Sequence, residues 1–187
     1  MTPAQSNTLA RIDAALAHLY HNRLTHFQQT GQRYSQHRQD LYSTKVKYVT
    51  FEAMVVAELY GRLQHEFEDD MAVFMEYPGL VADRIDLHVD PAVHTQHAPA
   101  YLELKMYHRR NDKAYRHDHE KLVQMIQADK KAIAVQVHFA LYYIPERPNE
   151  KIIRQSVQML RPRDYWSSIK RIGCPKFHFY RVAFGRK

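Results

Sequence analysis

The chain has 187 residues, of which 45% are hydrophobic, and it shows no internal repeat or low-complexity tract. This length and composition suit a single globular domain spanning residues 1–187. The formal net charge of +7 favours an anionic partner, with nucleic acid ahead of a membrane surface. The single cysteine, Cys174, excludes an internal disulfide, and neither a signal peptide nor an apolar run of membrane-spanning length is present. We therefore expect a cytoplasmic protein without a membrane contact.

Residues 1–49 predict a helical N-terminal extension. Thr2 can cap a helix whose first residue is Pro3, and Gly31 is suited to end it. The apolar residues at helical spacing are Leu9, Ile12, Leu16, Leu19, Tyr20 and Phe27. The stretch 32–48 mixes basic residues with tyrosines, which is typical either of a nucleic-acid surface or of a connector with ordinary surface charges. Its candidate contacts to nucleic acid are Arg33, Arg38, Lys45 and Lys47.

A second helix is predicted from a cap at Thr50 to about Asp69. Its apolar row consists of Phe51, Val55, Leu59, Leu63 and Phe67, with Met54 alongside. At about 100° per residue, Glu58 falls inside this apolar arc, where a carboxylate is costly unless it is paired or binds a metal. Arg62 lies one turn further and offers the pairing. Glu58 is therefore either an ion-paired helical acid or a metal ligand, and Glu52 and Glu66 also lie near the arc.

Three strands are predicted next. Met71–Tyr77 and Arg84–Val89 flank a turn at Pro78-Gly79 and read as a hairpin, and Ala100–Met106 follows. Alternation places Ile85, Leu87 and Val89 on one face of the second strand and Arg84, Asp86 and His88 on the other. In the third strand, Leu102, Leu104 and Met106 share one face, opposite Tyr101, Glu103 and Lys105.

These alternations gather Asp86, Glu103 and Lys105 on one polar sheet face. Carboxylate oxygens suit a hard divalent cation such as Mg²⁺, which can neutralise a phosphodiester and activate a bound water. Lys105 could orient that water or stabilise the transition state. The competing interpretation is a solvated face with a cross-strand ion pair, which contributes little to stability.

The second half of the chain continues with a basic stretch, a helix and a strand. Candidate phosphate contacts in the basic stretch are Arg109, Arg110, Lys113 and Arg116. A helix is predicted from Asp118 to Asp129, with Lys121 at the edge of its apolar stripe, either snorkelling to solvent or turned toward the acidic pair. The strand Ala134–Ile144 follows a crossover and should pair in parallel with the sheet.

The C-terminal part, residues 145–187, predicts two helices and an edge strand. The helices are Asn149–Leu160 and Asp164–Ile172, the latter stopped by Gly173, and the strand is Lys176–Phe184. Among other candidate sites, a zinc centre built on His88, His94 and His97 is disfavoured because no cysteine lies nearby. No glycine-rich phosphate loop is present in the sequence.

The order of elements over about residues 50–144 resembles the PD-(D/E)XK nuclease superfamily, whose α/β core is an α-β-β-β-α-β arrangement around a mixed sheet. The residues that carry the resemblance are Asp86, the Glu103-Leu104-Lys105 motif, Glu58 upstream and Lys121 downstream. The resemblance implies that Asp86 and Glu103 bind Mg²⁺, with Mn²⁺ as a substitute, and that Lys105 assists the attacking water. Glu58 would be a further acidic ligand and Lys121 an auxiliary catalytic residue. The proline that gives the motif its name is absent, since Ile85 precedes Asp86.

Two functions follow as hypotheses. The first is a magnesium-dependent endonuclease that hydrolyses DNA, with RNA as an open alternative substrate and a homodimer as the arrangement that small nucleases of this kind often use. The second is a nucleic-acid-binding or assembly module on the same fold, in which the acids serve structure.

Overall fold

The computed structural model describes residues 1–24, 44–68, 70–78, 84–91, 96–106, 112–139, 164–173 and 179–187. At 23–24, 44–51, 78, 106 and 112 only the backbone is described. Several predictions from the sequence concern residues outside these ranges. They are the apolar helical position Phe27, the helix end at Gly31, the Pro78-Gly79 turn and the helix Asn149–Leu160. The predicted nucleic-acid contacts Arg33, Arg38, Arg109 and Arg110 also lie outside them.

The described strands form one six-stranded mixed sheet in the order β1-β2-β3-β4-β6-β5. Their bounds are β1 Met71–Pro78, β2 Arg84–Pro91, β3 Ala100–Met106, β4 Ile133–Phe139, β5 Tyr165–Arg171 and β6 Phe179–Arg186. β3 and β4 are parallel, and the other neighbouring pairs are antiparallel. The hairpin of β1 with β2 and the parallel crossover between β3 and β4 were both predicted, and both are confirmed.

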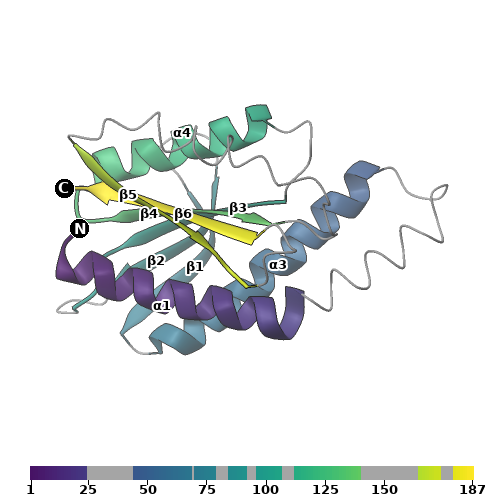
Figure 1. Ribbon diagram of the computed structural model, residues 1–187, viewed down its shortest axis with the longest axis horizontal. Helices are drawn as coiled ribbons and strands as arrows, with labels where there is room; N and C mark the ends of the chain where they lie inside the picture. Colours follow the sequence, from purple (N-terminus) through teal and green to yellow (C-terminus); the bar gives the residue numbers. More distant parts are fainter. Residues whose placement is uncertain are drawn as a thin grey trace.

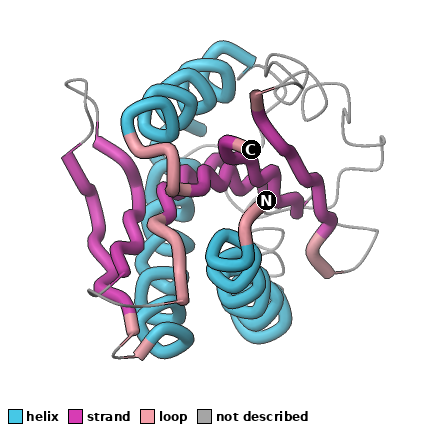
Figure 2. The backbone as a smooth tube through the Cα atoms, turned by 90° about the vertical axis from the view of Figure 1, so that its left-hand side faces the viewer, coloured by secondary structure: helices cyan, strands magenta, loops and turns pink. Residues whose placement is uncertain are grey.

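Helices cover both faces of the sheet (Figures 1 and 2). The helix α1, Pro3–Leu19, continues into the π-helical turn η1, Tyr20–Leu24, and packs with α3, Thr44–Phe67, on one face. The helix α4, Asp112–Ala128, covers the other face. The protein is therefore a mixed α/β fold, and α3, β1, β2, β3, α4 and β4 follow one another in the predicted order.

Alternation in the central strands fills two separate cores. Leu102 and Leu104 of β3 point toward α1 and α3, together with Val135, Val137 and Phe139 of β4. Tyr101 and Ala134 point the other way, toward Leu122, Met125 and Ile126 of α4. All seven residues of β4 are buried, as expected of a strand with neighbours on both edges and helices on both faces.

The N-terminal helix begins as predicted. The Thr2 hydroxyl accepts a hydrogen bond from the backbone N–H of Gln5, and the Gln5 side chain accepts one from the Thr2 N–H, which completes a capping box. The predicted apolar residues that lie within the described part of this helix and of η1 are all buried: Leu9, Ile12, Leu16, Leu19 and Tyr20.

The predicted starts of the other two helices are wrong. α3 begins at Thr44 rather than Thr50, and α4 begins at Asp112 rather than Asp118. Val55, Leu59, Leu63 and Phe67 are fully buried, as their spacing predicted. Met54 is 42% exposed, because the buried stripe of α3 is narrower than the predicted arc. Thr50, the predicted cap, and Asp118, the predicted first residue, are thus interior helical positions.

The C-terminal part departs most from prediction. Residues 165–171, expected as a helix, form the strand β5. β5 pairs with β6 along its whole length, from Tyr165 opposite Arg186 to Arg171 opposite Tyr180. β6 is consequently an interior strand rather than the predicted sheet edge. Within the described part of the chain, no helix has the length and apolar character needed to cross a membrane.

Candidate active site

The candidate site lies where β2 and β3 separate. Their pairing extends from Val89 opposite Ala100 to Leu87 opposite Leu102, and stops there. One residue further along β2, the Asp86 carboxylate accepts a hydrogen bond of 2.7 Å from the backbone N–H of Leu104. A side chain therefore satisfies a β3 donor that regular strand pairing no longer reaches.

The backbone on the other side of β2 is also irregular. Glu76 of β1 has φ of +49°, in the left-handed region that is uncommon for a residue other than glycine. It lies between two paired positions, Met75 opposite Leu87 and Tyr77 opposite Ile85. Ile85 packs in the core under α4, whereas Leu87 packs in the opposite core. The prediction that Ile85 shares a face with Leu87 and Val89 is therefore wrong, because the alternation of β2 is interrupted between Ile85 and Leu87.

Glu103 points from β3 toward α4, as its alternation predicted. The residue is 2% exposed, and its Oε1 atom lies 2.7 Å from the Nζ atom of Lys121. The same Nζ donates a hydrogen bond of 3.1 Å to the carbonyl of Arg84 and lies 3.6 Å from Oδ1 of Asp118. Lys121 is thus turned into the site, with only 11% of its side chain exposed, and it does not snorkel to solvent.

Lys105 joins elements from both faces of the sheet. Its Nζ atom lies 3.3 Å from Oε1 of Glu52 on α3 and 3.4 Å from Oδ2 of Asp118 on α4. Asp118 is 4% exposed, and it lies between the two lysines because its Oδ2 faces Lys105 and its Oδ1 faces Lys121. We call Asp86, Glu103, Asp118, Lys105 and Lys121 the acid–lysine cluster.

Burial and mutual repulsion shift the protonation of the acids. Burial, followed by the charges of Asp86 and Asp118, raises the pKa of Glu103 to about 8, against the opposing effect of Lys121. Burial also raises the pKa of Asp86, although the hydrogen bond from Leu104 and the nearby lysines oppose the shift. Burial and the neighbouring carboxylates therefore disfavour the charged forms of Asp86 and Glu103 more than the two lysines favour them.

The pKa values of Lys105 and Lys121 are both raised, which favours the charged form of each side chain. Burial alone lowers the pKa of Lys105, but Asp118, Glu52 and Asp86 raise it above its ordinary value. For Lys121, the opposing effect of burial is likewise outweighed by Glu103, Asp118 and Asp86. Both ammonium groups are therefore positively charged at neutral pH and act as hydrogen-bond donors.

The chemistry of the acids fits a hard divalent cation. Mg²⁺ takes oxygen ligands and commonly binds through one or two carboxylates, with water completing its coordination. Asp86 and Glu103 supply such oxygens, and a cation between them would oppose both causes that raise the pKa of Glu103, which are burial first and then the charges of the neighbouring acids. Among the residues that the structure describes, no group of three or more His, Cys, Asp or Glu side chains is placed to hold a metal. A site built here would therefore rest on two carboxylates and water.

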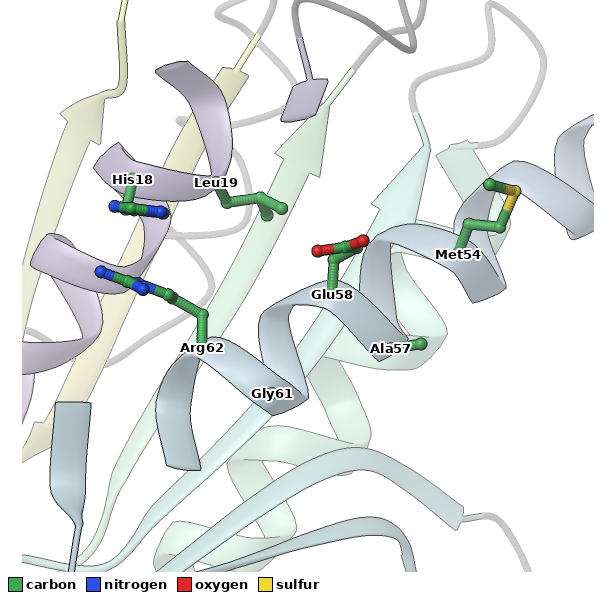
Figure 3. A pocket seen from close by; sticks show the side chains of 7 residues that line it. All are labelled: His18, Leu19, Met54, Ala57, Glu58, Gly61 and Arg62. Atoms are coloured by element: carbon green, nitrogen blue, oxygen red, sulfur yellow. The ribbon is translucent and has the colours of Figure 1, made fainter. Parts of the chain in front are cut away.

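Glu58 lies in a different part of the molecule from these acids. It lines a cavity of about 550 Å³ between α1 and α3, together with His18, Leu19 and Arg62 (Figure 3). This places Glu58 at the helix pair on the sheet face opposite α4, whereas Glu103 contacts α4. On α3 the acid that contacts the cluster is Glu52, through Lys105.

The remaining residues singled out from the sequence lie either on the surface or in packed positions. Lys113 and Arg116 are exposed on the first turns of α4, and the backbone of Lys45 and Lys47 lies at the start of α3. His88, one of the histidines weighed for zinc, is 3% exposed, and its ring stacks on Tyr101 with centroids 4.5 Å apart. Its Nδ1 lies 3.2 Å from the carbonyl oxygen of Ala100, so this histidine is held by packing and by the backbone.

Sequence reasoning missed the roles of Asp118 and Glu52. Asp118 was predicted only as the first residue of its helix, yet it lies one turn before Lys121, and that spacing on a helix places the two side chains together. Glu52 lies near the predicted apolar arc of α3, as Glu58 does, and only the packing of α3 on the sheet distinguishes them.

We compared the chain with models of known protein families, with curated proteins and with solved structures, and none of the three comparisons gave a match.

Proposed function

We propose that this protein is a metal-dependent endonuclease that hydrolyses phosphodiester bonds in DNA, with the acid–lysine cluster as its active site. One observation carries the proposal: acids and lysines from β2, β3 and α4 converge in a buried cluster where the sheet opens. Buried charges are costly, and buried groups with strongly shifted pKa values concentrate at functional sites.

Each residue of the acid–lysine cluster would have a distinct chemical role. Asp86 and Glu103 would hold a Mg²⁺ ion, which supplies charge neutralisation for the phosphate and lowers the pKa of a bound water. Lys105, charged at neutral pH, donates hydrogen bonds and therefore orients the attacking water or stabilises the negative transition state. It does not act as the general base, because its pKa is raised rather than lowered. Asp118 contacts both lysine ammonium groups and fixes where they lie.

Charge outside the cluster supports nucleic acid as the substrate. The chain carries a formal net charge of +7, and Lys113 and Arg116 are exposed on α4, the helix that also carries Asp118 and Lys121. Lysine and arginine side chains near such a site bind phosphates without regard to base sequence.

The test is cleavage of supercoiled plasmid DNA in the presence of Mg²⁺. Asp86→Asn keeps a hydrogen-bond acceptor for the Leu104 N–H but removes the charge, and Lys105→Met removes the ammonium. We expect each to reduce the cleavage rate by about a hundredfold or more. Asp70→Asn and Lys170→Met, which change charges of the same type elsewhere on the surface, should cleave at the wild-type rate. Wild-type cleavage by both cluster variants would refute the assignment.

A second candidate is a nucleic-acid-binding module in which the cluster is structural. The observation in its favour is that Lys121 already contacts Glu103 at 2.7 Å and thereby links α4 to the sheet. Titration with Mn²⁺ separates the two candidates. If the ion neither raises the melting temperature nor enables cleavage, while DNA still binds and the binding weakens with salt, the binding module is correct.

A further inference from the structure

We propose that Lys121 is a resident counter-cation of Glu103, which an incoming divalent cation displaces toward Asp118. This inference concerns how the cluster admits its ion and rests on the metal site proposed above. Lys121 would thereby compete with every incoming cation for Glu103, and monovalent ions would not bind the carboxylate strongly enough to displace it.

The first step of the argument is the burial of Glu103. With 2% of the residue exposed, its carboxylate is separated from solvent and needs a positive partner within the protein. Lys121 provides it at 2.7 Å. A divalent cation that uses Glu103 must therefore replace an ammonium group already in contact with the carboxylate oxygen.

The second step is that Lys121 has another acceptor within reach. Its Nζ lies 3.6 Å from Oδ1 of Asp118, one turn earlier on the same helix. Because the same Nζ already lies 2.7 Å from Glu103 and 3.6 Å from Asp118, a short displacement of the Lys121 side chain is enough to exchange one contact for the other. The other oxygen of Asp118, Oδ2, lies 3.4 Å from Lys105, so Asp118 is placed to hold both ammonium groups once the cation occupies Glu103.

The third step concerns selectivity. The cluster faces charged groups from every adjacent element: Glu52 of α3, Asp86 of β2, Glu103 and Lys105 of β3, and Asp118 and Lys121 of α4. A divalent ion attracts a carboxylate about twice as strongly as an ammonium at the same distance, whereas a monovalent ion has no such advantage. Competition from Lys121 therefore lowers the affinity for divalent ions and excludes monovalent ones.

The test is calorimetric titration of the full chain with Mn²⁺ in the absence of nucleic acid. Lys121→Met removes the competing charge, and we expect it to bind Mn²⁺ at least about tenfold more tightly than wild type. Lys121→Gln, which can still donate a hydrogen bond to Glu103, should also bind Mn²⁺ more tightly than wild type. This variant replaces Lys121→Met in the experiment if the Met variant fails to fold. Lys170→Met, which removes an ammonium that contacts Asp13 elsewhere in the fold, should leave the affinity unchanged.

A double-mutant cycle then tests the role of Asp118. Asp118→Asn should weaken Mn²⁺ binding in the wild-type background, because the group toward which Lys121 would move loses its negative charge. The weakening should shrink several-fold in the Lys121→Met background, where no ammonium has to move. If the effects of the Asp118 and Lys121 substitutions on the Mn²⁺ binding free energy are simply additive, the proposed role of Asp118 is overturned.

The outcomes distinguish this inference from the proposed function. If wild type and both Lys121 variants bind Mn²⁺ with equal affinity, the counter-cation role is overturned while the metal site stands. If none of them binds Mn²⁺, the metal site and the inference are overturned together.

Discussion

His119 of α4 shows at the scale of one residue how burial decides protonation. It is 1% exposed, and its ring packs on Phe184 with centroids 4.9 Å apart. Burial lowers its pKa to about 4, although the side chain of Gln136 acts in the opposite direction. The ordinary pKa of a histidine is about 6.5, so the unfolded chain takes up this proton before the folded one does.

A pH dependence of stability follows. Since the folded pKa is depressed, the contribution of His119 is fully present above pH 6.5 and is lost as the pH falls toward 4. Full protonation of this residue alone corresponds to a loss of about 3 kcal/mol. Urea unfolding between pH 4 and 7 should therefore show a smaller acid-induced loss in His119→Leu than in wild type. His65→Leu, which changes an exposed histidine of α3, should keep the wild-type slope, and equal slopes in all three proteins would contradict the prediction.

Sequence patterns identified some residues of the candidate site and not others, for a physical reason. Strand alternation has a period of two, so Glu103 and Lys105 could be assigned a common direction from sequence alone. The direction of a helical side chain depends on the phase and start of the helix, and because the predicted start of α4 was six residues late, Asp118 was taken for its first residue. Choosing Glu52 over Glu58 requires knowing how α3 packs on the sheet, which no local pattern contains.

At the scale of elements, a buried ion network attaches α1 to the C-terminal strands. Arg181 of β6 is 3% exposed and donates to Asp13 of α1 at 2.8 and 2.9 Å. Its Nη1 atom donates to the carbonyl and hydroxyl oxygens of Ser168, and Lys170 of β5 also contacts Asp13. The guanidinium of Arg181 is thus buried with its charge paired and with hydrogen-bond partners on two elements.

Removing the acid of this network should be costly. Asp13→Ala leaves the buried Arg181 without its counter-charge, and we expect a loss of about 3–5 kcal/mol in the free energy of unfolding. The matched control is Asp70→Ala, which breaks an exposed ion pair with Arg11 and should cost less than about 1 kcal/mol. Chemical denaturation of both variants gives the comparison, and similar losses would show that burial does not govern this network.

The strand β5 was mispredicted because its stability comes from distant partners. Asp164 and Gly173 are residues that cap and stop helices, and the segment between them has the length of a short helix. In the fold, Trp166 donates a hydrogen bond of 3.0 Å to Gln5 of α1, and β5 pairs with β6 throughout. Contacts of this kind override local propensity, whereas β1 to β4 were predictable because each shows clear alternation or a continuous apolar run.

At the scale of the whole molecule, the sheet separates two environments. One face is an apolar core under α1 and α3, and the other combines an apolar core with the acid–lysine cluster under α4. Lys105 lies between α3 and α4, because it contacts Glu52 of one helix and Asp118 of the other. The proposed chemistry is therefore placed where the two helical layers meet, beside the separation of β2 from β3.

The most direct test of this account is a crystal structure of the protein soaked with Mn²⁺, examined by anomalous scattering. We predict an anomalous peak within bonding distance of carboxylate oxygens from both Asp86 and Glu103, with Lys121 shifted toward Asp118. A saturating soak without a peak at these carboxylates, and with Lys121 still on Glu103, would contradict the central claim that the cluster is a metal-dependent active site.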